Sequence, residues 1–589
     1  MRRLWVILFI FIFACRSFAP LPAPTFPAPS VVLETPFLPF GAAPDSEVEE
    51  TAAAPTLPAP RFRAAAPYSV RIHPDGRQFV GDWLSFEVMA AEEPLPIDAK
   101  VQIQLNDGAI KPLAEAPVAP FGIGGRLQAT FTWAWDTRGL QAGDYDLVFS
   151  VQPGRIAFTE TITLLPQNEL PAVERGAAWA SATSDCCTLY YVTGTAAERD
   201  LPELLDLADE QAEEAEDRMG VQFSSPVTIT LLPRLLGQGG FANDEIHISY
   251  LDRNYSAGSA AIILHHEMIH ILDSRLGGEL RPSLLTEGLA VYLSGGHFKP
   301  EPLLPRAVVL LDPVGNSSLP GLGWYVPLEE LADHFYAAQH EIGYLEAGAL
   351  VEYMVSRWGW QAFSTFYRDI HPHPSGRQAE AVDASLMKHF NLTLDGLEAA
   401  FLERLQHQPV EPGLLEDVRQ TVNFYDSMRR YQQLLDPSAY FMTAWLPDTR
   451  EMRQRNILAD YLRQPVETAN LALEILLAET GADLAQGRFG LVEQNLGAVN
   501  RVLDAMEQGE PEPFTRDQKA FDYYQIVQAL QRGRFYIDPY SRGEISPQRI
   551  EVNGNQAQAW ISLDGPELIQ VTLVRTPGGW WFRQFWEGN

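Results

Sequence analysis

The chain has 589 residues, of which 46% are hydrophobic and 20% charged, as is typical of a folded protein. Its length is too great for one core and favours about three or four domains. Asp and Glu outnumber Lys and Arg by 76 to 43, which gives a formal net charge of -33. That acidity argues against a nucleic-acid or anionic-lipid surface, because no basic stripe is present to neutralise phosphates.

The N-terminus has the pattern of an export signal. Arg2 and Arg3 precede an apolar run that is shorter than the roughly 20 residues needed to span a bilayer. The run ends in Ile-Phe-Ala-Cys, which resembles a bacterial lipobox and implies lipidation of Cys15 after cleavage. Ordinary cleavage after Ala19 is the alternative. Residues 1–15 are therefore predicted to be a signal peptide, and the protein is expected outside the cytoplasm, secreted or held at the cell surface as a lipoprotein.

Two segments follow before any expected catalytic residue. Residues 16–66 are rich in Pro and Ala and predict an extended linker. Residues 67–166 contain short alternating strands with turn signals, which predict a β-sandwich. The Gly-Asp-Tyr-Asp-Leu-Val sequence at 143–148 resembles the late strands of bacterial immunoglobulin-like modules. Such a sandwich is expected to be a spacer, or else a binder of carbohydrate or protein.

The remaining chain is predicted to be a mixed domain over residues 170–411, a helical region over 412–507 and a small α+β domain over 514–589. The last of these resembles nuclear-transport-factor-like domains. Hydrophobic periodicity places the main elements of the mixed domain. The helices are Leu201–Met219, Ala260–Leu276, Ser283–Leu293 and Tyr344–Trp358, and the strands are Val227–Leu232 and Glu245–Tyr250. Within this domain Cys186 and Cys187 are adjacent, so they are either two buried small residues or a vicinal disulfide.

The strongest chemical signal is the sequence His265-His266-Glu267-Met268-Ile269-His270. Residues four apart on a helix lie about 40° from eclipsed, so His266 and His270 point at one place and can bind one zinc ion. Glu267 projects beside that place, where a carboxylate can take a proton from water and pass it to a leaving amine. His265 faces about 100° away and is not an alternative ligand. The motif is short, and histidines on an apolar helix are often core residues.

A third ligand is predicted on the next helix. Glu287 is the one carboxylate of the apolar segment Ser283-Leu284-Leu285-Thr286-Glu287-Gly288-Leu289-Ala290, where an unpaired charge would be costly. Two imidazoles and one carboxylate with an open fourth position make a hydrolytic zinc centre. The two motifs together resemble the gluzincin metallopeptidases, and most closely the bacterial peptidase-MA-like extracellular domains. The resemblance covers residues 170–411 and implies an α+β gluzincin fold.

The resemblance also implies roles for residues outside these motifs. An edge strand just before the zinc helix would pair with a peptide substrate through Ala242, Asn243 and His247, or it is an ordinary sheet edge. Tyr344 would donate its hydroxyl to the oxyanion, unless it is only a packed tyrosine. The reserves for that role are His340, His297 and Tyr336. From its position three residues after His270, Asp273 could orient a ligand ring, or it could form a surface ion pair with Arg275.

The sequence therefore predicts a multidomain, secreted or membrane-tethered zinc metallopeptidase that hydrolyses peptide bonds. It would bind a peptide or protein substrate and no nucleic acid, and would meet a membrane only through a lipid on Cys15. The alternative is a cell-surface binding lipoprotein in which the zinc domain is a scaffold. The exopeptidase motif Gly-x-Met-Glu-Asn is absent from the sequence, so the resemblance does not extend to an aminopeptidase.

Overall fold

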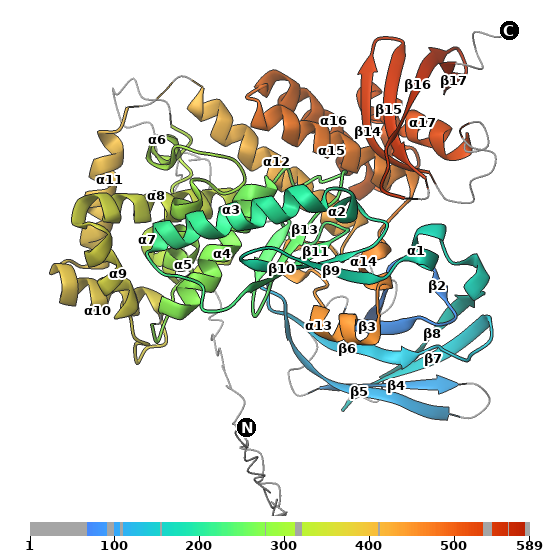
Figure 1. Ribbon diagram of the computed structural model, residues 1–589, viewed down its shortest axis with the longest axis horizontal. Coiled ribbons are helices and arrows are strands. Elements are labelled where there is room, and N and C mark those ends of the chain that lie inside the picture. Colours follow the sequence, from blue (N-terminus) through green and yellow to red (C-terminus); the bar gives the residue numbers. More distant parts are fainter. Residues whose placement is uncertain are drawn as a thin grey trace, which may run out of the picture. The chain divides into compact units, whose positions relative to one another are not determined.

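The computed structural model describes residues 68–90, 99–106, 110–153, 156–276, 278–311, 321–409, 411, 413–533, 537, 545–563 and 565–583. The chain has an N-terminal β-rich region, a central and mainly helical region, and a C-terminal β-sheet (Figure 1). The predicted signal peptide with Cys15 and the predicted linker lie outside the described residues. Within the described ranges, no helix is both long enough and apolar enough to span a membrane.

The N-terminal region is a sheet whose strands follow the order β1-β3-β6-β5-β4-β7-β8-β2. The long strand β5 pairs with β4 through its first half and with β6 through its second half, so it joins the two parts of the sheet. Alternate residues of β4 are buried, and those of β3, β4 and β7 meet in one core. The strands are β1 Tyr68–His73, β2 Gln78–Phe79, β3 Trp83–Ala90, β4 Lys100–Asn106, β5 Ile110–Phe121, β6 Arg126–Asp136, β7 Gly143–Gln152 and β8 Ile156–Leu165.

The central region is built on a five-stranded mixed sheet of order β12-β13-β11-β10-β9. Strands β10, β11 and β13 run parallel, and the two outer strands pair antiparallel with their neighbours. The edge strand is therefore β12, whereas the sequence placed the edge at the segment that forms β13. The sequence missed β12 because it has only three residues and no alternating pattern. The strands are β9 Trp179–Thr183, β10 Cys187–Val192, β11 Val227–Leu232, β12 Gly240–Ala242 and β13 Ile246–Ser249.

Helices cover this sheet and extend the same core. The predicted helices at 201–219 and 260–276 have the expected bounds, while α8 begins at His340, four residues before the expected start. Gln339 caps it by accepting a hydrogen bond from the Ile342 N–H at 3.0 Å. The helices of the central region are α1 Ala172–Gly176, α2 Ala196–Arg199, α3 Leu201–Met219, α4 Ala260–Leu276, α5 Ser283–Ser294, α6 Leu303–Ala307, α7 Leu328–His334, α8 His340–Trp358, α9 Trp360–Arg368, α10 Gln378–Phe390 and α11 Leu394–Gln406.

The C-terminal part contains further helices and an antiparallel sheet of order β14-β15-β16-β17. Side chains of α12, α15, α16, α17 and this sheet share one core. The helices are α12 Leu414–Leu435, α13 Thr449–Arg455, α14 Ala459–Leu462, α15 Thr468–Ala485, α16 Phe489–Glu507 and α17 Gln518–Arg532. The strands are β14 Ser546–Asn553, β15 Gln556–Ser562, β16 Ile569–Thr576 and β17 Gly579–Phe582.

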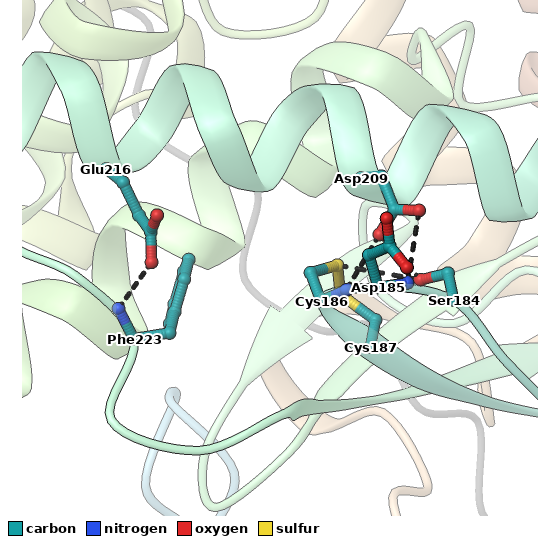
Figure 2. Close-up of a disulfide and its surroundings, with 7 residues drawn as sticks. All are labelled: Ser184, Asp185, Cys186, Cys187, Asp209, Glu216 and Phe223. Atoms are coloured by element: carbon teal, nitrogen blue, oxygen red, sulfur yellow. Dashed lines mark hydrogen bonds between the residues drawn. A yellow bond between two sulfur atoms is a disulfide. The ribbon is translucent and has the colours of Figure 1, made fainter.

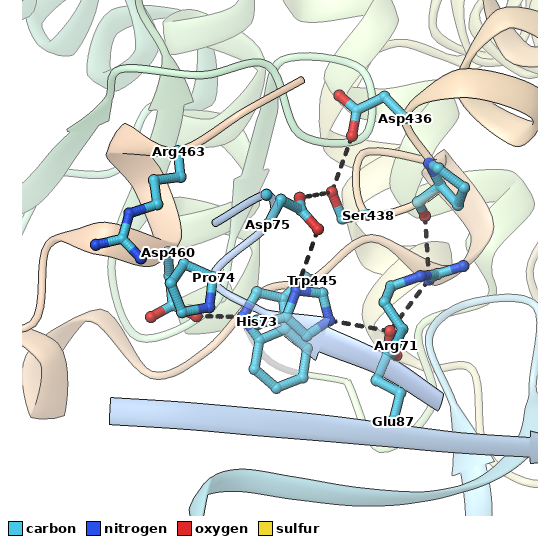
Figure 3. A network of polar contacts seen from close by, with 12 residues as sticks. Arg71, His73, Pro74, Asp75, Glu87, Asp436, Ser438, Trp445, Asp460 and Arg463 are labelled. Atoms are coloured by element: carbon cyan, nitrogen blue, oxygen red, sulfur yellow. Dashed lines mark hydrogen bonds and ion pairs between the residues drawn. The ribbon is translucent and has the colours of Figure 1, made fainter. Parts of the chain in front are cut away.

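The segment between α12 and α15 ties the N-terminal sheet to the central region. A register shift where β3 pairs with β6 turns Trp133 (φ 46°) out of the N-terminal core. Its ring packs instead with Leu236 and with Ala439 and Tyr461 of the connecting segment. A network of polar side chains also joins the two parts: the Ser438 hydroxyl of the connecting segment donates a hydrogen bond to Asp75 of the N-terminal region (Figure 3).

Candidate metal centre

Two consecutive helices bring three potential ligands to one point. Helix α4 carries His266 and His270 one turn apart, and α5 carries Glu287. The two histidine Nε2 atoms lie 3.0 Å apart, and Glu287 Oε2 lies 3.4 Å from His266 Nε2 and 3.3 Å from His270 Nε2. This group could hold a metal ion. The structure thus brings together all three residues that the sequence predicted as ligands.

The three potential ligands lie on buried helices, where their polar side chains have little contact with water. Met268 and Leu284, on the same two helices, are fully buried. His266 is 7% exposed and Glu287 is 8% exposed, so both have lost most of their contact with water. A buried imidazole or carboxylate is costly unless it is paired or bound to a metal.

The pKa values of His266 and Glu287 favour the forms that bind a metal ion, whereas the pKa of His270 favours its protonated form. Burial lowers the pKa of His266 to about 4, so this imidazole is neutral. Burial opposes the charge on Glu287, but the neighbouring His270 and His266 hold its pKa well below the ordinary value. Burial also opposes the charge on His270, but Glu287 raises its pKa to about 9. A metal ion at this place would therefore compete with a proton on His270.

Glu267 follows His266 on α4, and its carboxylate lies between this helix and the edge strand β12. It is 6% exposed and lines the same cavity as the ligands. A Cβ atom on Gly240 of β12 would lie 3.1 Å from Glu267 Oε1, so the carboxylate is close to the strand backbone. Burial raises the pKa of Glu267 to about 7, although His270 lowers it. A carboxylate with a pKa near neutrality is suited to accept and then donate a proton.

Two tyrosines also line the cavity: Tyr344, which the sequence predicts as the oxyanion donor, and Tyr336, which is a reserve for that role. Tyr336, named only as a reserve, donates a hydrogen bond from its hydroxyl to Glu287 Oε1 at 2.7 Å. Tyr344 lies on α8 with its ring centroid 6.3 Å from that of His266. Tyr336 lies in a short 3-10 turn, Phe335–Ala337, where no periodicity marks a functional residue.

The other two reserves, His297 and His340, flank Tyr344. Each ring centroid lies 4.2 Å from that of Tyr344. His297 Nδ1 is 2.7 Å from Glu341 Oε1, and His340 Nδ1 is 3.1 Å from the Gln238 amide nitrogen. His297, His340 and Glu341 form a second group that could hold a metal ion, next to the first.

Asp273 supports the centre through neighbours of the ligands. It is 1% exposed and accepts hydrogen bonds from the Tyr367 hydroxyl at 2.9 Å and from Arg281 at 3.3 Å. The Tyr367 hydroxyl is also 3.0 Å from that of Thr286, the residue before Glu287. Asp273 therefore connects α4 to α9 and α5, while the side chain of its expected partner, Arg275, lies outside the described residues.

The three residues predicted to bind substrate have different surroundings. Ala242 lines the cavity. Asn243 accepts a hydrogen bond from the Glu245 N–H at 3.1 Å and shapes the turn between β12 and β13. His247 is 3% exposed, stacks on Phe241, and has its Nε2 2.9 Å from the Thr449 hydroxyl. The His247 ring therefore lies in the interior.

In the part of the chain that the structure describes, β12 is an edge strand, with β13 as its one neighbour in the sheet. Gly239 accepts a hydrogen bond from Ser249, and the Asn243 N–H donates one to Glu245, so residues 239, 241 and 243 face β13. In an antiparallel pair the alternate residues point the other way. The backbone groups of Gly240 and Ala242, which line the cavity, are therefore directed away from β13.

A third cluster, Cys186, Cys187 and Asp209, lies elsewhere in the central region and is shown in Figure 2. The two cysteines form a disulfide, which is the second of the two possibilities left open by the sequence. Asp209 Oδ1 accepts hydrogen bonds from the Ser184 hydroxyl at 2.7 Å and from the Cys186 N–H at 2.8 Å. Because disulfide sulfurs are not thiolates, this cluster is a poor metal site.

Neither the models of known protein families nor the curated proteins gave a match to this chain. The interpretation of the centre therefore depends on its own residues and geometry.

Proposed function

We propose that this protein is a zinc-dependent metallopeptidase that acts outside the cytoplasm and hydrolyses peptide bonds. The observation that carries the proposal is the mutual distance of the donor atoms of His266, His270 and Glu287, which is 3.0–3.4 Å. Ligands about 2.0–2.2 Å from a tetrahedral zinc ion lie about 3.3–3.6 Å from one another. Two imidazoles and one carboxylate that leave the fourth position open are the ligand set of catalytic zinc.

Zinc bound there would polarise the scissile carbonyl and make water a stronger nucleophile at neutral pH. Glu267 is the general base: it takes a proton from the attacking water and gives it to the leaving amine. The products are a carboxylic acid and an amine, so one water molecule is consumed for each C–N bond broken. Burial of Glu267 supports this role, because it holds the pKa of the carboxyl near neutrality.

Two further features support a peptide substrate. The outward-facing backbone of Gly240 and Ala242 can pair with an extended peptide by β-augmentation. Tyr344 faces the ligands from α8, and its hydroxyl is the donor that we assign to the oxyanion. The substrate would then run along β12, with its scissile carbonyl between Glu267 and Tyr344.

The fold-family assignments and the location are part of the same proposal. We assign the central region to the gluzincin, peptidase-MA-like type, the N-terminal region to the immunoglobulin-like type and the C-terminal region to the nuclear-transport-factor-like type. The Pro/Ala-rich linker and Cys15 support attachment to a membrane. The Cys186–Cys187 disulfide supports an oxidising compartment, since disulfides persist there.

The metal site is tested by measuring bound zinc by mass spectrometry. Wild-type protein should bind one zinc ion per chain, and His270→Ala should lose it. His265→Ala is the matched control, because His265 is a buried neighbour on the same helix that contacts Gln211 at 3.1 Å instead of the ligands. Equal and negligible zinc in all three proteins would refute the site.

Catalysis is tested with Glu267→Gln and a peptide library. This variant should keep its zinc and lose cleavage by at least about 100-fold, because the amide cannot act as a base. Cleavage equal to that of wild type would remove Glu267 as the base. A zinc-bound wild-type protein that cleaves no peptide, and instead retains a binding partner, would favour the scaffold function.

A further inference from the structure

The cavity beside the metal centre is not formed by the central region alone. It has a volume of about 250 Å³, and its walls come from three distant parts of the chain. The N-terminal region contributes Ile123 from the turn between β5 and β6. Helix α12 contributes Tyr425, and the connecting segment after it contributes Phe441, Ala444 and Leu446. The rest of the lining belongs to the central region.

Apart from Tyr425, the side chains that line the cavity from outside the central region are apolar, and two of them are unusually exposed. Ile123 is 49% exposed and Leu446 is 41% exposed, although both are large aliphatic side chains. Exposed apolar side chains gathered at one cavity mark a ligand-binding surface. The carboxylates and imidazoles of the lining are those of the three potential ligands, Glu267 and His297, all of the central region.

The turn that carries Ile123 is fixed in place by direct contact with the connecting segment. The Gly124 N–H donates a hydrogen bond to the Met442 carbonyl oxygen at 2.9 Å. Gly122 has φ +68°, and a Cβ atom there would collide with the same oxygen. The turn therefore uses glycines both for its backbone conformation and for close approach, and this holds Ile123 at the cavity.

A continuous wall of rings leads from the metal ligands to this apolar side. Tyr344, which faces His266, is followed by His340 at a centroid distance of 4.2 Å. His340 is followed by Phe441 at 4.9 Å. A peptide that places its carbonyl at the metal ligands can therefore place a neighbouring side chain against Phe441.

We propose that Ile123, Phe441, Ala444 and Leu446 form a substrate subsite that binds a large apolar side chain next to the scissile bond. This inference rests on the proposed metallopeptidase function and adds its specificity. The occupant is a side chain of an extended peptide, because the backbone of Gly240 and Ala242, which is directed away from β13, lies in the same cavity. The N-terminal region is then part of the substrate-binding site, and the expectation that it is a spacer is incomplete.

The test is cleavage of a peptide library by the zinc-loaded full chain and by Ile123→Ser and Leu446→Ser. Wild type should prefer a large apolar residue at one position flanking the cleaved bond. Each variant should lower kcat/KM about tenfold for peptides with Leu or Phe at that position, and less than twofold for peptides with Ala there. Both residues are exposed at the cavity, so the variants should fold, as checked by their thermal unfolding.

Val466→Ser and Leu491→Ser are matched controls. Val466 is 50% exposed and Leu491 is 42% exposed, and neither lines the cavity. Both control variants should keep the wild-type rate and preference.

Three outcomes would overturn the inference. If wild type cleaves peptides and both cavity variants keep its rate and preference, the subsite is wrong while the metallopeptidase function stands. If wild type binds zinc and cleaves nothing, the proposed function fails and the subsite fails with it. If Ile123→Ser converts a dimer into a monomer in light scattering, the apolar residues form an interface between copies of the chain.

Discussion

Tyr336 and Tyr344 differ in what their hydroxyl groups contact. The Tyr336 hydroxyl donates a hydrogen bond to Glu287, and burial, together with the nearby carboxylate, raises the pKa of Tyr336 above its usual value. The Tyr344 hydroxyl has no hydrogen-bond partner among the described residues, although the residue is only 6% exposed. An uncommitted buried donor beside the ligands is suited to a charge that develops only during the reaction. Tyr336 is better suited to orienting a ligand.

We therefore expect Phe substitutions at these two positions to have different effects. Tyr344→Phe should lower kcat about 100-fold and leave zinc affinity unchanged, because it removes one oxyanion donor. Tyr336→Phe should weaken zinc binding at least about tenfold, because Glu287 loses its hydrogen bond. Steady-state kinetics and competition with a zinc chelator measure the two quantities. If Tyr336→Phe has the larger effect on kcat at saturating zinc, the two roles are exchanged.

Helix α5, which carries Glu287, packs against α8, which carries Tyr344, so the distance between the two helices sets the distance between these residues. Glycines occupy the contact on both helices. A Cβ on Gly288 would collide with the backbone carbonyl of Ala347, and a Cβ on Gly348 would lie too close to Val291. The residue after the carboxylate ligand must therefore be glycine for a packing reason, since a backbone carbonyl cannot move aside as a side chain can.

Gly288→Ala should destabilise the fold by about 1–3 kcal/mol and weaken zinc binding, because α8 must move away from α5. Gly490→Ala is the control: it is also a helical glycine, on α16, but a Cβ there meets nothing within 4 Å. In that open position alanine should stabilise the helix by about 0.5–1 kcal/mol. Urea unfolding of the two variants measures both changes. If Gly288→Ala is as stable as wild type, the contact between α5 and α8 can adapt to the added methyl group.

Local patterns predicted the elements of the centre well. Helix α4 and its ligand spacing follow from periodicity, and Glu287 was found because a lone carboxylate interrupts an apolar helix. The residues that the sequence missed act over long distances. Ile123 reaches the cavity from another part of the chain, and no local pattern links it to Leu446. Similarly, β12 is too short to show alternation, so the edge of the sheet was placed one strand too far inside.

Across the whole molecule, buried charges connect the N-terminal sheet, the central region and the connecting segment. Arg463 of the connecting segment donates hydrogen bonds to Asp82 at 2.6 and 2.9 Å and to Glu174 at 2.9 Å. Arg234 of the central region, 1% exposed, contacts Asp75 and Asp436, each at 3.0 Å. If the N-terminal region were only a spacer, few buried ion pairs between it and the rest of the chain would be expected. Fixed placement of the N-terminal region is what a subsite containing Ile123 requires.

Arg463→Met tests this connection. The substitution leaves the carboxylates of Asp82 and Glu174 buried without their cation, so we expect a loss of about 3–5 kcal/mol of unfolding free energy. Arg501→Met is the control, since Arg501 is 54% exposed and pairs with Asp517 at the surface. Its effect should stay below about 1 kcal/mol. Calorimetry should also show the N-terminal region of Arg463→Met unfolding separately.

The deficit of Arg463→Met should depend on pH in one direction. Burial already raises the pKa of Glu174 in the folded protein, against the opposing effect of Arg463. Without the arginine the folded-state pKa should rise further above its unfolded value. A carboxyl whose pKa is raised by folding favours the folded state below its unfolded pKa, and this advantage is lost as the pH rises through the folded pKa. The deficit should therefore be smaller at pH 5 than at pH 8 in denaturant titrations. A deficit that grows as the pH falls would show that the two carboxylates find other cations once Arg463 is gone.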